Sequence, residues 1–412
     1  MGSSMTTGSP WLVDCEDVAW FRDQPEGARG AAAALGRRIG LGVQRTAELV
    51  LAVAELVTNA DKHAVDGSVL LRVLRNEAVA GVEVVVVDSG PGMADVPAAL
   101  RDGMSTVGTL GIGLGTVQRL ADTFDIHSRP GIGTVQLARF WPRPVHSSPA
   151  GESVVGGITR PIGGEQVCGD AWTARIDTGE QPASPCGAAT LESGESTPAP
   201  YDWSVLTAAR PSTKLPHAAA RRLQPFPRAE SLGRCVPVRD AAPGPGEGLL
   251  VMSCDGLGHG PMAAVAAQAA VQAFRTGAAR TPEQAMEQVH RALRGTRGAA
   301  VAIARLEPDG RLLFCGVGNI TAALVTTTAR SSLLSHPGIA GHRMHQLRTY
   351  EYRLPAHGVL VMHSDGLSER WSAPDLADGL LHHPPAVIAT GLLRHAGTRR
   401  DDASAVIAKA AW

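Results

Sequence analysis

The sequence predicts two α/β domains in tandem, and three observations point to this fold class. The chain has 412 residues, more than one ordinary core holds at roughly 150 residues per domain. Its first part, up to Trp141, alternates helical and strand patterns and ends in a polar, proline-containing stretch, "PRPVHSSPAGES". A second ordered segment begins near Val154. We therefore expect a first domain at 8–142, a linker at 143–153 and a second domain at 154–412.

Composition narrows the class of function. The 38 basic and 39 acidic residues nearly balance, so nucleic acid and anionic membrane surfaces are not expected partners. There is no apolar leader and no stretch of about 18 apolar residues. The six cysteines lack C-x-x-C spacing, and none has an arginine six positions downstream. We expect a cytoplasmic protein with reduced thiols and without the thiolate loop of cysteine phosphatases.

Within the second segment, residues 179–246 are rich in Pro, Ala, Ser and Gly and show little periodicity. This composition predicts a long, largely disordered insertion. After it, the pattern predicts an Ala-rich helix from Pro261 and strands at Ala299–Arg305, Arg311–Cys315 and Ala403–Ala408.

A helix in the first segment carries a line of polar groups. In "AELVLAVAELVTNADKHA" the apolar residues recur at helical spacing, while Glu55, Asn59 and His63 follow one another at i+4. One face is therefore core and the other aligns polar side chains. An ordinary solvated helix face has the same pattern, so this helix alone does not define a site.

The next segment, "GVEVVVVDSGPGM", is a continuous β-branched run that stops at Asp88 and turns through Gly90 and Gly92. Such a run is typical of a buried strand. A carboxylate at the end of a buried strand needs a hydrogen-bond donor. Either the amino group of a ligand or an amide of the turn meets that need.

A glycine-rich stretch follows, "DGMSTVGTLGIGLGTVQRLADTF", in which Gly111, Gly113 and Gly115 open a helix. Free N–H groups and the helix dipole favour phosphate at such a position. The glycines alone are weak evidence for phosphate binding. A dinucleotide-binding fold needs a buried strand directly before them, where this chain is polar, and the Walker lysine is absent.

The order of these boxes, ending in "GIGT" at 131–134, resembles the GHKL (Bergerat) ATP-binding α/β sandwich, and in detail the RsbT-like serine kinases of sigma-factor regulation. The resemblance implies ATP and Mg²⁺ as cofactors, with Asn59 on the magnesium, Asp88 on the adenine amino group and Thr134 supporting that contact. The glycine lid would cover the phosphates. Glu55, one helical turn from Asn59, would be the general base for an attacking serine. The chain has no phosphoacceptor histidine helix, which argues against a sensor histidine kinase. His63 is read as a structural residue of the helix.

The second segment contains two similar stretches, "VMSCDGLGHG" and "VMHSDGLSER". In each, an apolar run delivers a carboxylate, Asp255 or Asp365, to a strand end. Asp170 and the pair Asp401–Asp402 occupy similar positions. A single Asp-Gly is most often a turn, but four converging carboxylate sites suit two hard cations, Mn²⁺ or Mg²⁺, which prefer oxygen ligands.

The stretches "GEQVCGDAW", "DGLGHGPMAAVAA", "GVGN" and "SDG" resemble the SpoIIE/PPM phosphatases, RsbX-like members in particular. The family has an α-β-β-α sandwich and two Mn²⁺ or Mg²⁺ ions. The resemblance implies metal ligation by Asp170, Asp255, Asp365 and Asp401 and by the carbonyl of Gly256. Asp402 competes with Asp401 for the last role. His259 is read as structural, and Arg160 is a substrate-phosphate candidate without a fixed position.

The combined resemblance implies a two-headed regulator of bacterial partner switching, a protein-serine kinase fused to a metal-dependent phosphoserine/phosphothreonine phosphatase. Its partners would be STAS-domain phosphoproteins of the anti-anti-sigma or stressosome type, with a downstream phosphatase or sigma-regulatory protein as a further candidate. The alternative is a phosphatase whose first domain uses ATP only to hold a partner. A gyrase-like or chaperone-like machine is disfavoured because the middle domain that it needs is missing.

Overall fold

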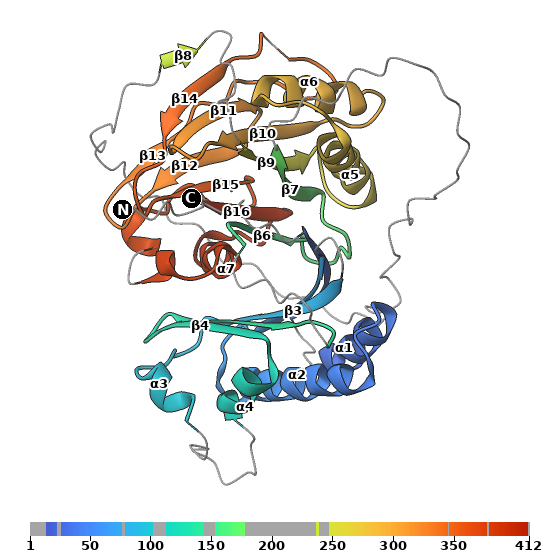
Figure 1. The fold of residues 1–412 in the computed structure, drawn as a ribbon, viewed down its shortest axis with the longest axis vertical. Coiled ribbons are helices and arrows are strands. Elements are labelled where there is room, and N and C mark those ends of the chain that lie inside the picture. Colours follow the sequence, from blue (N-terminus) through green and yellow to red (C-terminus); the bar gives the residue numbers. More distant parts are fainter. Residues whose placement is uncertain are drawn as a thin grey trace, which may run out of the picture.

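The computed structural model describes residues 14–22, 26–75, 79–101, 113–143, 153–177, 236–238, 247–344, 346–376 and 379–410. The described chain builds six stacked layers, helices, sheet, helix, sheet, sheet and helices, from the bottom of Figure 1 to its top. The lower two layers come from the first part of the chain, and the upper four come from the second part.

The first part forms a five-stranded antiparallel sheet in the order β1-β2-β3-β5-β4. Its strands are β1 (Asp14–Phe21), β2 (Ser68–Arg75), β3 (Ala80–Val87), β4 (Thr123–Arg129) and β5 (Gly133–Phe140). Its helices are α1 (Gly27–Arg38), α2 (Val43–His63), α3 (Val96–Ala99) and α4 (Gly113–Leu120). Helices α1, α2 and α4 cover one face of the sheet (Figure 1).

The second part packs two antiparallel sheets face to face. One has the order β7-β9-β10-β11-β14-β8, and the other has the order β13-β12-β15-β16-β6. The strands of the first sheet are β7 (Asp170–Asp177), β8 (Val236–Val238), β9 (Gly248–Gly256), β10 (Ala299–Leu306), β11 (Arg311–Val317) and β14 (Thr349–Arg353). Those of the second are β6 (Val155–Arg160), β12 (Thr321–Val325), β13 (Arg330–Ser332), β15 (Val359–His363) and β16 (Ala403–Lys409).

Helices cover both outer faces of this sandwich. Helices α5 (Pro261–Thr276) and α6 (Pro282–Ala292) lie on the first sheet. The helix α7 (Pro385–Ala396) and the short 3-10 turns η2 (Ala373–Leu376) and η3 (Leu380–His382) lie on the second. The mixed α/β class and the α-β-β-α arrangement that the sequence predicted are therefore confirmed.

Helix α7 lies between the second sheet and the sheet of the first part (Figure 1). One continuous apolar cluster joins residues of the two parts, for example Leu70, Val85 and Leu137 with Val387 and Leu392. This explains the β-branched run of β3, because its residues face α1 and α2 on one side and α7 on the other. The two parts thus share a core, which the sequence did not predict.

A buried polar network ties β1 and β2 to β6 at the same joint. Arg72 pairs with Asp17 at 2.5 Å and with Glu83 at 2.8 Å, and it also donates to the Gly157 carbonyl at 2.6 Å. The second oxygen of Asp17 accepts from the backbone N–H and the hydroxyl of Thr159 at 2.6 and 2.7 Å. Removing one member would leave a buried charge unpaired, at a cost of about 3–5 kcal/mol, so this joint is built to stay closed.

The helix from Pro261 and the three predicted strands are all present, each strand running one or two residues further than expected. Within the predicted insertion at 179–246 the structure describes only β8, an edge strand on β14. Of the predicted linker at 143–153 it describes only the two end residues. Among the described residues, no helix has the length and apolar character needed to cross a lipid bilayer.

Candidate functional sites

Neighbouring strands of the first sheet bring two of the predicted metal ligands together. Asp170 opens β7 and Asp255 lies near the end of β9, and the antiparallel register makes their Cα atoms direct partners. Asp170 is buried. Its Oδ2 atom has no hydrogen-bond partner among the described residues. The hydroxyl groups of Ser364 and Ser404 lie close enough to the Asp170 carboxylate to lower its pKa, against the larger effect of burial. The Oδ2 atom is thus a buried acceptor that can still take a ligand.

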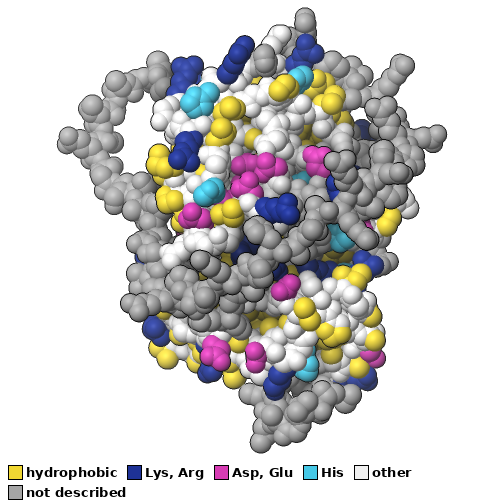
Figure 2. Space-filling view, turned by 180° about the vertical axis from the view of Figure 1, so that it is seen from behind, with side chains coloured by type: hydrophobic (Ala, Val, Ile, Leu, Met, Phe, Trp, Pro, Cys, Tyr) yellow, Lys and Arg dark blue, Asp and Glu magenta, His cyan; other side chains and the backbone are white. Residues whose placement is uncertain are grey.

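The other two predicted carboxylates come from the second sheet. Asp365 follows β15 and Asp401 precedes β16, and both line an open pocket of about 490 Å³ together with Thr398 and Arg400. Asn319 donates from its amide to the Asp365 Oδ2 atom at 2.7 Å, which fixes the carboxylate. Acidic side chains gather on the upper half of the molecule in Figure 2, with a basic side chain beside them.

The competition between Asp401 and Asp402 has a geometric answer. The two oxygens of Asp402 accept from the backbone N–H groups of Ile162 and Gly169, both at 2.7 Å, and the side chain is buried. Asp402 therefore anchors the segment that leads into β7. Asp401 lines the pocket beside Asp365, so of the two neighbours it is the one that faces this pocket.

The two Asp-Gly repeats need glycine for the same reason. A Cβ on Gly256 would lie 2.5 Å from the Ala263 carbonyl oxygen, and one on Gly366 would collide with the Asp402 carbonyl oxygen. Each glycine lets another backbone segment approach the strand end that carries the carboxylate. The repeat is thus a packing device that draws the acids of two sheets together.

Burial and the neighbouring negative charges make ionisation of these carboxyl groups unfavourable. Burial raises the pKa of Asp170 to about 7. Burial, together with the charges of Asp170, Asp365 and Asp401, raises the pKa of Asp255 to about 9. Burial and then the charge of Asp401 also raise the pKa of Asp365, while the Asn319 amide opposes that shift. Like charges brought together in this way favour either a proton or a cation between them.

The donor set fits hard divalent cations. It consists of carboxylates, with an orphaned buried oxygen on Asp170 and like charges that oppose ionisation. Oxygen ligands and retained waters are what Mg²⁺ and Mn²⁺ prefer. Among the described residues, no three His, Cys, Asp or Glu side chains are grouped as a ready-made metal cage. The fit therefore rests on the chemistry of the donors.

The two remaining candidates of this segment lie apart from that pocket. The His259 Nδ1 atom is 3.4 Å from a Glu165 carboxylate oxygen, and its side chain is 57% exposed. Arg160 ends β6 and lines a different cavity, between the two parts of the chain. The interpretation of Arg160 as a group that meets the substrate phosphate at the metal pocket is thus not supported by its position.

In the first part, α2 places Glu55 and Asn59 on one face, as the spacing predicted. The Asn59 amide donates to the Glu55 Oε1 atom at 3.3 Å. The same oxygen accepts from the backbone N–H of Gly113 at 3.1 Å. Glu55 thus meets the first residue of α4, where the glycine-rich stretch ends. His63 is exposed at the end of α2.

The end of β3 forms the second wall of this site. Burial raises the pKa of Asp88, whose Oδ1 atom accepts from the Gly90 N–H at 2.7 Å. The Asp88 N–H donates to the Thr134 carbonyl at 3.0 Å, and the Thr134 hydroxyl lies 2.9 Å from the Ser128 hydroxyl. The Gly90 amide of the turn is therefore one of the hydrogen-bond donors that the Asp88 carboxylate needs.

The predicted glycines of this site are only partly described. Gly92 has φ +65 and lies against the Arg129 carbonyl, a place that excludes other side chains. Gly113 begins α4 with φ +68, and Gly115 is buried within it. Gly111 lies outside the described residues.

Comparison with known proteins agrees with both halves. Residues 22–139 match the histidine kinase-like ATPase domain family, and residues 245–411 match the stage II sporulation protein E (SpoIIE) family. The serine/threonine-protein kinase RsbT of Bacillus subtilis (strain 168) is 35% identical over 117 residues, which cover 27% of this chain and 88% of that protein. The first part of the chain belongs to the RsbT family, and it is fused to a SpoIIE domain. The RsbT-like domain thus contains Glu55, Asn59 and Asp88, and the SpoIIE domain contains three of the four carboxylates within the matched range.

Solved structures are similar to the chain at lower identity. RsbX in complex with magnesium is 16% identical with a TM-score of 0.39, covering 61% of this chain and 92% of that one. The PP2C phosphatase domain of SpoIIE from Bacillus subtilis, with a fragment of its regulatory domain, is 11% identical with a TM-score of 0.37, covering 93% of each chain.

Sequence reasoning missed one residue of the SpoIIE domain. Asn319 lies in the quoted "GVGN" stretch but was given no role, although it holds Asp365. An amide in a glycine-rich turn between two strands was the available signal. Its partner was not visible, because 46 residues separate the two side chains.

Proposed function

We propose that the chain is a bifunctional regulator of partner switching. Its RsbT-like domain, expected at 8–142, would phosphorylate a serine or threonine of a STAS-domain protein, and its SpoIIE domain, expected at 154–412, would remove that phosphate. The observation that carries the proposal is two pairs of carboxylates, Asp170 with Asp255 and Asp365 with Asp401, whose charges together raise the pKa of Asp255. The same chain also keeps Glu55 beside Asn59.

In the dephosphorylation reaction, Asp170, Asp255, Asp365 and Asp401, with the Gly256 carbonyl, would hold two divalent cations. Such cations supply Lewis-acid stabilisation of the phosphoryl oxygens and activation of the attacking water. Asn319 keeps the Asp365 carboxylate in place through its 2.7 Å hydrogen bond. Asp402, whose oxygens are taken by backbone amides, anchors the segment beside the site.

In the phosphorylation reaction, the hydroxyl oxygen of the partner's serine would attack the γ-phosphorus of ATP, and ADP would leave. Glu55 would accept the hydroxyl proton. Because Asn59 donates to Glu55 through its amide nitrogen, its carbonyl oxygen is directed elsewhere and suits a magnesium ion. Asp88 and Thr134 would hold the adenine, with the glycine-rich stretch over the phosphates.

One observation favours a second candidate, in which the first domain is only an ATP-dependent binding switch. The Glu55 Oε1 atom already accepts two hydrogen bonds, from Asn59 and from the Gly113 N–H. A proton would therefore have to go to the Oε2 atom, unless α4 moves and frees Oε1. In this second candidate the SpoIIE domain alone turns over, and Glu55 serves only to position α4.

The experiment incubates the full chain with ATP, Mg²⁺, Mn²⁺ and the STAS-domain protein encoded nearest to it, and follows the partner's phosphorylation on phosphate-affinity gels. Asp365→Asn should let the phosphorylated partner accumulate, whereas Asp309→Asn, a change in an exposed turn, should not. Glu55→Gln should slow phosphorylation by about 100-fold or more with unchanged ATP binding, and His63→Gln on the same helix face should not.

The outcomes separate the candidates. If only dephosphorylation occurs and Glu55→Gln binds the partner like the wild type, the binding switch replaces the kinase. If neither reaction occurs on any STAS-domain partner, the proposed cycle is wrong. Dephosphorylation that survives EDTA but stops on cysteine alkylation would refute the metal centre itself.

A further inference from the structure

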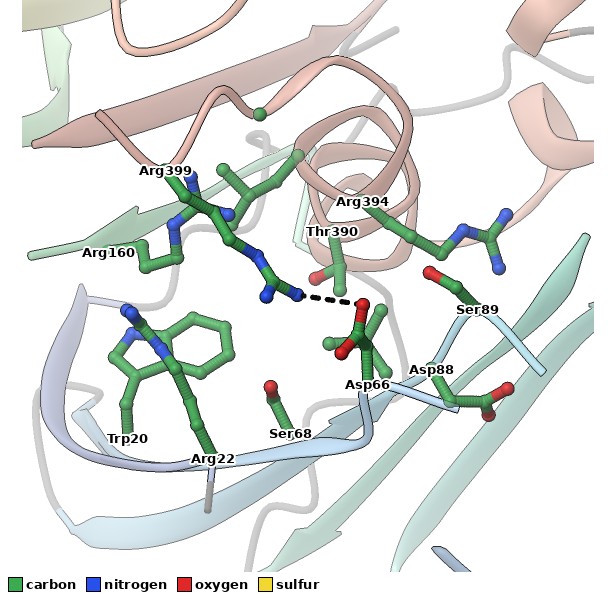
Figure 3. Close-up of a pocket in the computed structure, with 13 residues that line it drawn as sticks. Trp20, Arg22, Asp66, Ser68, Asp88, Ser89, Arg160, Thr390, Arg394 and Arg399 are labelled. Atoms are coloured by element: carbon green, nitrogen blue, oxygen red, sulfur yellow. Dashed lines mark ion pairs between the residues drawn. The ribbon is translucent and has the colours of Figure 1, made fainter. Parts of the chain in front are cut away.

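A second cavity, of about 60 Å³, lies at the joint between the two parts of the chain. The RsbT-like side contributes Trp20, Arg22, Asp66 and Ser68 from its strand ends, and the SpoIIE side contributes arginines from β6, α7 and the segment after α7 (Figure 3). Of the residues that line this cavity, the proposed phosphorylation cycle uses only Asp88.

The lining of this cavity is unusually basic for a partly buried site. Three guanidinium groups and one carboxylate lie together in this lining, an excess of two positive charges; they are those of Arg22, Arg160, Arg399 and Asp66 (Figure 3). Arg394 and Asp88 line the cavity on the other side, with their charged groups directed away from the first four. Arginine rather than lysine suits tetrahedral oxyanions, because its planar fork donates two parallel hydrogen bonds.

Arg160 is the central observation. Its side chain is only 8% exposed, yet its Nε and Nη2 atoms have no hydrogen-bond partner among the described residues. Burial, together with the charges of Arg22 and Arg399, lowers the pKa of Arg160 to about 10. A buried guanidinium with two unsatisfied donors is costly, and an anion in the cavity would satisfy it.

The neighbouring arginines are constrained as well. Arg394 has a buried Nη1 atom without a partner in the described chain. Arg399 reaches across the joint to Asp66 at 3.5 Å, and both residues have positive φ, 57 and 54. A left-handed backbone conformation is strained for an arginine, so the surrounding structure must stabilise it. Arg399, whose side chain is 58% exposed, thus lies at the open rim of the cavity, while Arg160 is buried inside it.

We propose that this cavity is a binding site for a phosphate group carrying two negative charges, either as inorganic phosphate or at the end of a small phosphomonoester. The excess of two positive charges matches a dianion, and the small volume admits a single tetrahedral group. Such a ligand would bridge the two domains through Arg160 of the SpoIIE side and Arg22 of the RsbT-like side, whose charges lie close enough to affect each other. Asp88 and Ser89 line the same cavity, so the site adjoins the adenine end of the proposed nucleotide site.

The test measures the melting temperature of the full chain, treated with EDTA and free of nucleotide, against increasing inorganic phosphate at constant ionic strength. Wild-type protein should show a saturable rise of about 1–3 °C. Phosphoserine added in a second arm distinguishes a free ion from a phosphomonoester. Acetate added in a third arm should give no rise, because one carboxylate supplies half the charge.

The variant Arg160→Met distinguishes a phosphate-binding arginine from one that only stabilises the fold. Without phosphate its melting temperature should lie above that of the wild type, because a buried unpaired charge is removed, and its rise with phosphate should be lost. Arg22→Gln should lose the rise too, while Arg294→Ala, at an exposed position after α6, should keep it.

The proposal is overturned if phosphate stabilises the wild type no more than acetate does. It is equally overturned if Arg160→Met and Arg22→Gln keep the full rise, since phosphate would then bind elsewhere. Should Arg160→Met fail to fold, calorimetric titration of phosphate into wild type and Arg22→Gln decides, with at least a 10-fold weaker affinity expected for the variant.

Discussion

The pocket that contains Asp365 and Asp401 and the interdomain cavity both use one short segment, residues 397–401, but they gather side chains of opposite charge. Thr398, Arg400 and Asp401 line the first, while Gly397 and Arg399 line the second. In the first, burial and neighbouring acids raise carboxyl pKa values. In the second, burial and neighbouring arginines lower a guanidinium pKa. The comparison teaches that each site concentrates one charge sign where an ion of the opposite sign would complete it.

The largest effect should come from Gly366→Ala, which breaks the acidic side alone. The added Cβ would collide with the Asp402 carbonyl oxygen, so the Asp365 turn must move away from β16. Phosphatase activity should fall by about 100-fold or more, because displacing a reacting group by 1 Å costs that much. Initial rates with a phosphorylated STAS-domain partner measure this.

Gly163→Ala is the matched control, since a Cβ there meets nothing within 4 Å. It should keep wild-type activity. The phosphate-induced stabilisation at the interdomain cavity should survive in any Gly366→Ala protein that folds. Loss of both responses together would mean that the two pockets are not independent.

A smaller effect is expected from Asn319→Ala, which leaves the carboxylates but frees Asp365. Losing a hydrogen bond that orients a metal ligand typically costs about 10–100-fold in metal affinity or activity. Activity measured against Mn²⁺ concentration should therefore require more metal. Thr321→Ala, two residues on and bonded to Glu369 instead, should titrate like the wild type, and an unchanged metal requirement in Asn319→Ala would remove this residue from the site.

The smallest effect concerns pH and the basic side. Burial, then the nearby charges of His383, Arg394 and Arg129, lowers the pKa of His127 to about 4, and Asp125 opposes this. The unfolded chain therefore binds the proton first, so stability is complete above about pH 6.5 and is lost as pH falls from there toward 4.

His127→Asn should flatten that loss. Between pH 7 and 5 the melting temperature of the wild type should fall by about 1–3 °C more than that of the variant. His357→Asn, at a turn outside this cluster, should follow the wild type. Equal pH slopes in all three proteins would show that His127 is not buried in its neutral form.

The sequence predicted most of what is local. The i+4 spacing of Glu55 and Asn59 put both on one face of α2, and the β-branched run before Asp88 became β3, because helical and strand periodicities are written in neighbouring residues. The doubled Asp-Gly signalled carboxylates at strand ends. The two family resemblances rested on such short stretches in order, and matches to the two families bear them out.

What the tertiary structure alone decided involves residues far apart in the chain. The choice of Asp401 over Asp402 as the pocket-facing acid depends on the Gly169 N–H, 233 positions away, which occupies Asp402. The shared core around α7 joins β3 to a helix 300 residues later. The unsatisfied guanidinium of Arg160 exists only because burial removes water from it. Local pattern fixes which face a side chain occupies, but only packing decides which distant groups meet it and whether solvent can reach it.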